Sequence, residues 1–153
     1  MRKLRIKYGN HSFCCIVMLI LSACAQEAAP PTVSLSIGEI NEMPAAELYN
    51  HIDSNTAPLI IDVRSSDEFD AGHIPGALNI AHSEFVDYPA ESLALLPTAR
   101  DAGIVVHCAS GKRAAIAMDI ITDAGYTNIS HLSGDFNGWD AADYPVEQNN
   151  RTN

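Results

Sequence analysis

Runs of apolar residues alternate with stretches of helical periodicity from residue 37 onward. The runs over residues 59–63 and 103–107 are the most continuous, which is typical of strands covered on both faces. Weaker strands are expected over residues 37–43, 77–80 and 128–132, and helices over residues 44–53, 67–71, 91–96 and 113–124. Strands that alternate with helices predict an α/β fold in three layers, with a central, mostly parallel sheet and helices on both of its faces.

Two of the predicted helices have features that suggest their ends and their buried face. Ser66 is expected to cap the helix over residues 67–71, because a serine side chain can accept a hydrogen bond from the first turn. The helix over residues 113–124 ends at Gly125. Its apolar stripe is expected to consist of Ile116, Ile120 and Ala124, with Ala117 and Ile121 beside it.

The first 23 residues follow a different pattern. Arg2, Lys3, Arg5 and Lys7 precede an unbroken apolar run over residues 13–21. This run is shorter than the roughly 20 residues that a membrane-spanning helix needs. A basic start followed by a short apolar stretch predicts a secretory signal peptide over residues 1–23.

The end of the apolar run resembles the lipobox of bacterial lipoproteins, in the residues Leu21-Ser22-Ala23-Cys24. The resemblance implies cleavage before Cys24 and a lipid on its sulfur, with residues 24–36 forming the lipidated cysteine and a flexible tether. The expected location is a bacterial membrane facing the periplasm, and Ala25 would favour the outer membrane under enteric-type sorting. The alternative is an ordinary secreted protein with a chance cysteine near the cleavage point.

Charge and cysteine content narrow the possible functions. Removal of the signal peptide leaves five Lys and Arg against 19 Asp and Glu, a formal charge of −14. Such a chain is not expected to bind nucleic acid, or anionic lipid by charge alone. No metal is expected, since His51, His82 and His131 lack metal-ligand spacing. Cys14 and Cys15 leave with the signal peptide and Cys24 would carry lipid, so Cys108 is the expected free thiol.

Cys108 lies where a predicted buried strand meets a predicted helix, in the segment His107-Cys108-Ala109-Ser110-Gly111-Lys112-Arg113. In parallel sheets, ligands bind at the carboxyl ends of strands. Short turns with Ser and Gly can point several backbone N–H groups inward, and a helix N-terminus adds a positive dipole end. We therefore expect this loop to stabilise the Cys108 thiolate, which is the reactive form of a cysteine.

The loop resembles the six-residue active loop of the rhodanese family, over Cys108–Arg113. The similarity extends upstream through Ile61-Asp62-Val63-Arg64, Glu68-Phe69 and Gly72-His73-Ile74-Pro75-Gly76-Ala77. It continues downstream through Gly125-Tyr126, Leu132-Ser133-Gly134, Trp139 and Tyr144-Pro145-Val146. Two positions depart from the family pattern: Ser133 where Gly is frequent, and Ala114 where Ser is frequent.

The resemblance implies a sulfurtransferase that needs no cofactor. Cys108 would take sulfane sulfur from a small anionic donor such as thiosulfate, as a persulfide, and pass it to cyanide, a thiol or a protein acceptor. Backbone N–H groups of Ala109, Ser110, Gly111, Lys112 and Arg113 would hold the persulfide, and the side chains of Lys112 and Arg113 would attract the donor. Asp62, Arg64 and Glu68 would give structural support, with Arg64 and Glu68 expected to pair. The domain would span residues 37–147, followed by a disordered tail over 148–153.

Two other functions remain open at the level of sequence. The domain could be a persulfide carrier or binding module that only partner proteins load and unload. A phosphatase or arsenate reductase is the less favoured alternative, because those relatives have five residues between Cys and Arg whereas Cys108 and Arg113 enclose four.

Overall fold

The computed structural model describes residues 41–149, which form a five-stranded sheet with helices on both faces. All neighbouring strands are parallel, in the order β1-β5-β4-β2-β3. The strands are β1 (Asn41–Met43), β2 (Leu59–Asp62), β3 (Leu78–Asn79), β4 (Ile104–His107) and β5 (Ile129–Leu132). This architecture confirms the predicted α/β fold with a parallel central sheet.

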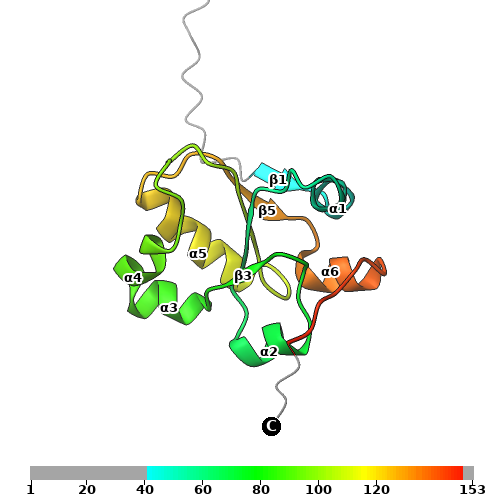
Figure 1. Cartoon of the computed structure of the whole chain (residues 1–153). Coiled ribbons are helices and arrows are strands. Elements are labelled where there is room, and N and C mark those ends of the chain that lie inside the picture. Colours follow the sequence, from blue (N-terminus) through cyan, green and yellow to red (C-terminus); the bar gives the residue numbers. More distant parts are fainter. Residues whose placement is uncertain (1–40, 150–153) are drawn as a thin grey trace, which may run out of the picture. The chain divides into compact units, whose positions relative to one another are not determined.

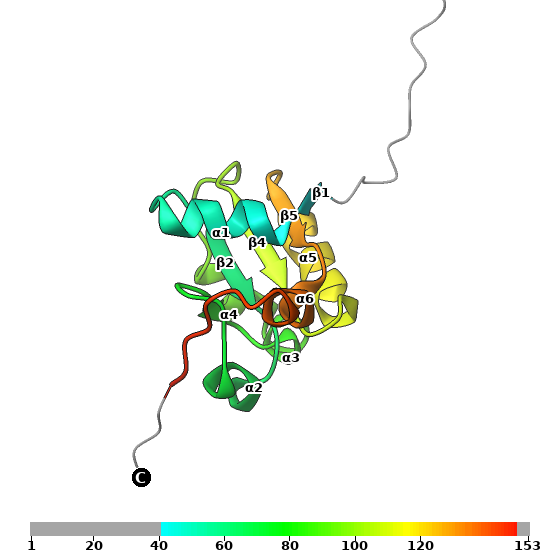
Figure 2. The same ribbon diagram turned by 90° about the vertical axis from the view of Figure 1, so that its right-hand side faces the viewer.

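Six helices are arranged around the sheet, and Figures 1 and 2 show α1 and α6 on one side of it, with α3, α4 and α5 on the other. Their bounds are α1 (Ala45–Asp53), α2 (Ser66–Ala71), α3 (His82–Asp87), α4 (Pro89–Ala94), α5 (Lys112–Asp123) and α6 (Asp135–Ala141). Helix α2 follows β2, and α5 follows β4. The carboxyl ends of these two adjacent strands therefore carry the loops that lead into α2 and α5.

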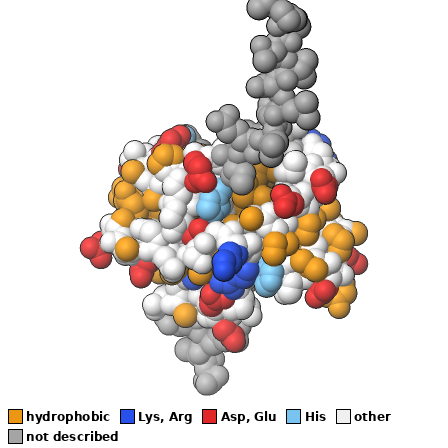
Figure 3. Space-filling model, turned by 180° about the vertical axis from the view of Figure 1, so that it is seen from behind, with side chains coloured by type: hydrophobic (Ala, Val, Ile, Leu, Met, Phe, Trp, Pro, Cys, Tyr) orange, Lys and Arg blue, Asp and Glu red, His pale blue; other side chains and the backbone are white. Residues whose placement is uncertain are grey.

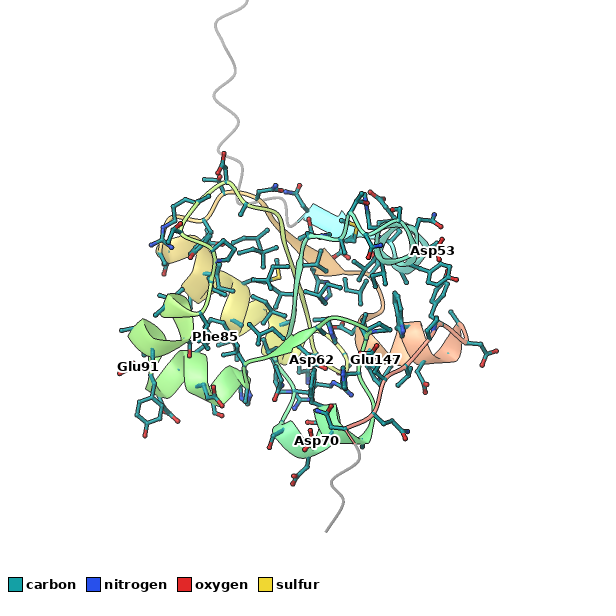
Figure 4. The ribbon with its side chains drawn as sticks, in the orientation of Figure 1. Asp53, Asp62, Asp70, Phe85, Glu91 and Glu147 are labelled. Carbon is teal, nitrogen blue, oxygen red and sulfur yellow. The ribbon has the colours of Figure 1, made fainter. Side chains whose placement is uncertain are left out.

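Side chains of β2 and β4 alternate between two hydrophobic clusters, as the two-residue period of a strand requires. Ile61 and Val106 face the cluster formed with α3, α4 and α5, which includes Phe85 (labelled in Figure 4). Ile60 and Val105 face the opposite cluster, which is formed with α1 and α6 around the fully buried Trp139. The sheet is thus covered on both faces, which explains why residues 59–63 and 103–107 read as continuous apolar runs.

The structure corrects several local predictions. Helices α3 and α6 were not predicted, because each is short and lacks an apolar stripe long enough to show a helical period. The cap of α2 is Ser65 rather than Ser66, and Ser65 forms a capping box with Glu68. In α5 the buried residues are Ala114, Ala117, Met118 and Ile121, whereas Ile116 is 44% exposed.

The C-terminal segment crosses back to α2. The main chains of His73 and Glu147 exchange hydrogen bonds of 2.8 and 2.9 Å, and the Asn149 amide nitrogen donates to the carbonyl oxygen of Asp70 at 3.1 Å. Contacts therefore extend two residues beyond the domain end expected at residue 147. The predicted signal peptide, Cys24, the tether and the last four residues lie outside the described part of the chain. No helix within residues 41–149 has the length and apolar character needed to span a membrane.

Candidate active site

The candidate nucleophile lies at the carboxyl end of β4, in a tight loop that leads into α5. Gly111 adopts a φ of +94°, a left-handed conformation that glycine reaches without a Cβ clash. The Gly111 backbone N–H donates to Cys108 Sγ at 3.1 Å. The loop thus directs one main-chain donor at the sulfur.

Cys108 is almost enclosed, with 1% of its surface exposed, and it packs against residues of the α3–α5 cluster such as Val106 and Ala114. Apolar enclosure by itself is the usual situation of a structural cysteine. In addition to this enclosure, the sulfur accepts the hydrogen bond from the Gly111 N–H. Because so little of the Cys108 surface is exposed, only a slim, terminal atom of a reactant can reach its sulfur.

Arg113 forms a bidentate ion pair with Glu68 across the loop. The two guanidinium nitrogens lie 2.6 and 2.8 Å from the carboxylate oxygens. Hydrogen bonds from Arg113 lower the pKa of Glu68 to about 2, and the same pair raises the pKa of Arg113. Since Glu68 also caps α2, the pair connects the start of α5 to the start of α2.

The expected pair between Arg64 and Glu68 does not form, because each residue has a different partner. Arg64 bonds Asp62, with its Nε 3.0 and 2.9 Å from the two carboxylate oxygens, and it donates to the Gly72 carbonyl at 2.7 Å. Its guanidinium also lies over the ring of Phe136. Asp62, labelled in Figure 4, and Arg64 form a buried ion pair that fixes the main chain at both ends of α2.

His107 precedes the nucleophile but faces the other side of the sheet, as strand alternation predicts. Its ring is fully buried, with Nε2 3.9 Å from Asp62 Oδ2. Burial lowers the pKa of His107 more strongly than the nearby Asp62 carboxylate raises it, so the ring is neutral at pH 7. Its Nδ1 lies 3.3 Å from the Cys108 carbonyl oxygen, and among residues 41–149 it forms no hydrogen bond with the Cys108 sulfur.

A second group of residues, which the sequence did not single out, lies behind the loop. Asp135 accepts a hydrogen bond from the Cys108 backbone N–H at 2.8 Å, and it also contacts His131, which in turn contacts Glu42. The one available signal was an aspartate directly after Ser133-Gly134, at the carboxyl end of a predicted strand. Spacing could not connect it to Cys108 or to Glu42. Within residues 41–149 no cluster of His, Cys, Asp and Glu side chains has metal-binding geometry.

Lys112 leaves the loop toward solvent and has no ion-pair partner among the described residues. Residues 41–149 contain four Lys and Arg side chains. Arg64 and Arg113 are paired, and Arg100 lies over the ring of Tyr126. Figure 3 shows a small group of basic atoms beside acidic ones, with further acidic atoms scattered over the rest of that face. Lys112 is therefore the exposed cation of the loop without an ion-pair partner among residues 41–149, whereas Arg113, paired with Glu68, also interacts with Cys108.

A cavity of about 340 Å³ lies next to the Arg113–Glu68 pair, between α2 and α6. Its lining includes Arg64, Glu68, Phe136 and Val146. Another cavity of about 350 Å³, lined by residues such as Pro58 and Gly103, lies at the amino ends of the strands and away from Cys108. Of these two cavities, the one beside Glu68 lies closer to the loop, although no residue of Cys108–Arg113 lines it.

The family model and the similar proteins agree on one family for this chain. The rhodanese-like domain family matches residues 44–142. The chain is 37% identical over 120 residues to the human thiosulfate:glutathione sulfurtransferase, covering 73% of this chain and 95% of that protein. It is 26% identical to the thiosulfate sulfurtransferase GlpE of Haemophilus influenzae, covering 74% of this chain and 97% of that protein. It is 38% identical to the probable adenylyltransferase/sulfurtransferase MoeZ of Mycobacterium tuberculosis, but spans only 23% of that protein.

Solved structures give the same fold. A rhodanese-related protein from Thermoplasma volcanium superposes with a TM-score of 0.58 at 32% identity, covering 70% of this chain and 97% of that one. A rhodanese-like domain from Anabaena superposes with a TM-score of 0.61 at 25% identity, covering 72% of this chain and 83% of that one.

Proposed function

The chain belongs to the rhodanese-like domain family, and from this premise we propose that it is a sulfurtransferase in which Cys108 carries sulfane sulfur as a persulfide. The observation that supports this role most directly is the hydrogen bond from the Gly111 amide to Cys108 Sγ at 3.1 Å. A thiolate held in this way is a nucleophile. Sulfurtransferases among the relatives, including a human one of which the match covers 95%, support the same reaction class.

The proposed reaction has two steps at one sulfur atom. The Cys108 thiolate attacks the outer sulfur of a thiosulfate-type donor, a new S–S bond forms, and sulfite leaves with the electron pair of the broken S–S bond. A thiolate or cyanide acceptor then attacks the outer sulfur of the persulfide and takes it away, which returns the Cys108 thiolate. The 1% exposure of Cys108 suits a donor that presents a single terminal sulfur. A thiol acceptor is favoured by the human relative, whose name specifies glutathione.

The test is the mass of the protein after exposure to thiosulfate. We expect wild-type protein to gain the mass of one sulfur atom on Cys108, and Cys108→Ser to gain nothing. Turnover with cyanide or glutathione as acceptor then distinguishes an enzyme from a carrier. A persulfide without turnover would favour the carrier, and absence of the adduct would contradict the proposal.

We assign attraction of the anionic donor to Lys112 rather than to Arg113, because Glu68 already neutralises the Arg113 guanidinium. Lys112→Ala is expected to raise the KM for thiosulfate by about threefold to tenfold, as loss of one exposed charge contact contributes roughly 1 kcal/mol. The matched control is Arg100→Ala, which removes an exposed cation from the loop before β4, at the amino ends of the strands. Equal effects of the two variants on KM would contradict the assignment.

We propose in addition that a lipid on Cys24 holds the domain at a periplasm-facing membrane surface, on the strength of the order of basic, apolar and lipobox residues over positions 1–24. Each acyl-chain methylene that is buried in the membrane contributes roughly 0.8 kcal/mol to the binding free energy. In a bacterial host, Cys24→Ala in the full chain should move the protein to the soluble fraction, whereas the control Cys14→Ala should stay with the membrane. Membrane retention of Cys24→Ala would contradict the anchor.

A further inference from the structure

An acidic side chain is built into the back of the active loop, where a like charge should disfavour a thiolate. Asp135 is the first residue of α6 and only 3% of its surface is exposed. Its φ of +55° is uncommon for a residue with a side chain, and the preceding Gly134 is also left-handed. The Cys108 N–H donates to Asp135 Oδ1 at 2.8 Å, and the Phe136 N–H donates to the Cys108 carbonyl at 3.0 Å. Two bonds thus connect the main chain of Cys108 to the start of α6.

His131 joins this carboxylate to a second one. Its Nε2 lies 3.2 Å from Asp135 Oδ2, and its Nδ1 lies 3.1 Å from Glu42 Oε1. Carboxylate oxygens accept hydrogen bonds, so a ring between two of them donates at both nitrogens and is an imidazolium. The hydrogen bond to Asp135, together with the one to Glu42, raises the pKa of His131 to about 9. Burial by itself raises the pKa of Asp135, but hydrogen bonds from His131 and from the Cys108 amide outweigh this effect and lower the pKa.

The groups that face His131 come from β1, α6, the active loop and β4. Glu42 faces it from β1 and Asp135 faces it from α6. From the active loop the neighbour is uncharged Gly111, where an added Cβ would lie 3.4 Å from Asp135 Oδ2 and 3.7 Å from the His131 ring. On β4, the adjacent His107 is neutral because burial lowers its pKa. His131 is therefore the cation that balances Asp135.

We infer that Asp135 is a positioning residue that fixes the main chain of Cys108, and that His131, held by Glu42, supplies the charge that allows this carboxylate to lie beside a thiolate. The inference deepens the proposed function, because it rests on Cys108 being the nucleophile. It assigns opposite electrostatic effects to two neighbouring residues. Asp135 disfavours the thiolate and His131 offsets that effect.

The test is the rate of Cys108 alkylation by iodoacetamide as a function of pH, measured on the wild-type chain and on two variants. Asp135→Asn keeps an oxygen acceptor for the Cys108 amide and removes the negative charge, so the midpoint of the alkylation profile should move to lower pH. His131→Gln removes the positive charge and should move the midpoint to higher pH. We expect each shift to be about 0.5 to 1 pH unit, toward the lower end of the effect of a nearby charge.

The chain offers matched controls for both variants. Asp143→Asn removes an exposed carboxylate that also has a φ of +55°, at the far end of α6. His51→Gln removes a histidine of α1 that bonds Thr56. Neither control should move the midpoint. Should Asp135→Asn fail to fold, the test rests on His131→Gln and Glu42→Gln, which should both move the midpoint to higher pH, Glu42→Gln by less. With that pair, an unchanged midpoint or a shift to lower pH in either variant would overturn the inference.

Opposite shifts of the two variants cannot come from loosened structure, which would expose the enclosed Cys108 and speed alkylation at every pH without moving the midpoints apart. Unchanged midpoints, or shifts in the same direction, would overturn the inference. Alkylation needs no sulfur donor, so this result stands apart from the sulfur-transfer assay. A protein that fails to transfer sulfur but shows opposite shifts would refute the proposed function alone.

Discussion

At the residue scale, the environment of Arg113, at the end of the active loop, is set by the Glu68 carboxylate that binds it. Glu68 holds both terminal nitrogens of Arg113 and caps α2 through Ser65. The guanidinium thus connects two helices, and it also interacts with Cys108. The neighbouring Lys112 keeps its charge exposed. Adjacent basic residues in the sequence thus have different physical environments.

Glu68→Gln tests this connection without removing the helix cap, because glutamine also serves at the third position of a capping box. We expect kcat/KM to fall by about tenfold as Arg113 is released, with less than about 1 kcal/mol lost in unfolding free energy because the pair is partly exposed. The control Glu91→Gln removes an exposed carboxylate of α4, which Figure 4 shows at the outer edge of the molecule. An equal loss of activity in both variants would contradict this role.

The charge of His131 also predicts how stability depends on pH. Its pKa of about 9 in the folded protein exceeds the ordinary 6.5, so the proton binds the folded state more tightly. This stabilisation is complete below pH 6.5 and is lost as pH rises through 9. Urea unfolding across this range should show a decline in the free energy of unfolding that is absent in His131→Gln. Parallel curves for the two proteins would show that His131 is not protonated in the fold.

At the scale of elements, the loop between β4 and α5 depends on a backbone conformation that only glycine adopts at low cost. Gly111 is left-handed, and a Cβ added at this position would lie 3.4 Å from Asp135 Oδ2. This geometry turns the Gly111 N–H toward Cys108 Sγ. Gly111 therefore allows the chain to turn between β4 and α5, and it also donates a hydrogen bond to the Cys108 sulfur.

Gly111→Ala should cost about 1 to 2 kcal/mol through left-handed strain, and it should reduce kcat/KM by at least about tenfold because the donor to Sγ moves. Gly76→Ala is the control, since Gly76 has a φ of +76° with nothing within 4 Å of an added Cβ. It should show a similar loss of unfolding free energy with unchanged activity. Equal activities of the two variants would indicate that the Gly111 amide has no part in the reaction.

At the scale of the whole molecule, acidic residues far outnumber basic ones. The full chain has 19 Asp and Glu against 9 Lys and Arg. Such a charge should repel an anionic donor at a distance, while salt screens the repulsion over roughly 8 Å at physiological ionic strength. The local contact with Lys112 then acts at short range.

We accordingly expect the KM for thiosulfate to fall by about twofold to fivefold as salt rises from low to physiological concentration. Alkylation provides a matched pair of probes. The rate with anionic iodoacetate should rise with salt, and the rate with neutral iodoacetamide should not change. A steep increase of KM with salt would mean that the cations of the loop, rather than the net charge, govern approach of the donor.

Local pattern was sufficient to determine much of this protein. Continuous apolar runs identified β2 and β4, Pro44 identified the start of α1, helical periodicity identified α5, and the run over residues 103–107 placed Cys108 at the carboxyl end of β4. These features depend on interactions between residues close in the chain, so they leave a trace in the sequence. Short helices such as α3 and α6 leave a weak trace, because six or seven residues define no clear period.

Only the tertiary structure decided which charged groups pair around Cys108. Glu68 binds Arg113 across 45 positions, Asp135 binds the Cys108 amide across 27, and His131 binds Glu42 across 89. A sequence pattern favours partners at helical spacing, which is why Arg64 was expected to bind Glu68. The fold instead brings the ends of separate strands to one edge of the sheet, and electrostatic energy depends on distance in space rather than on separation along the chain.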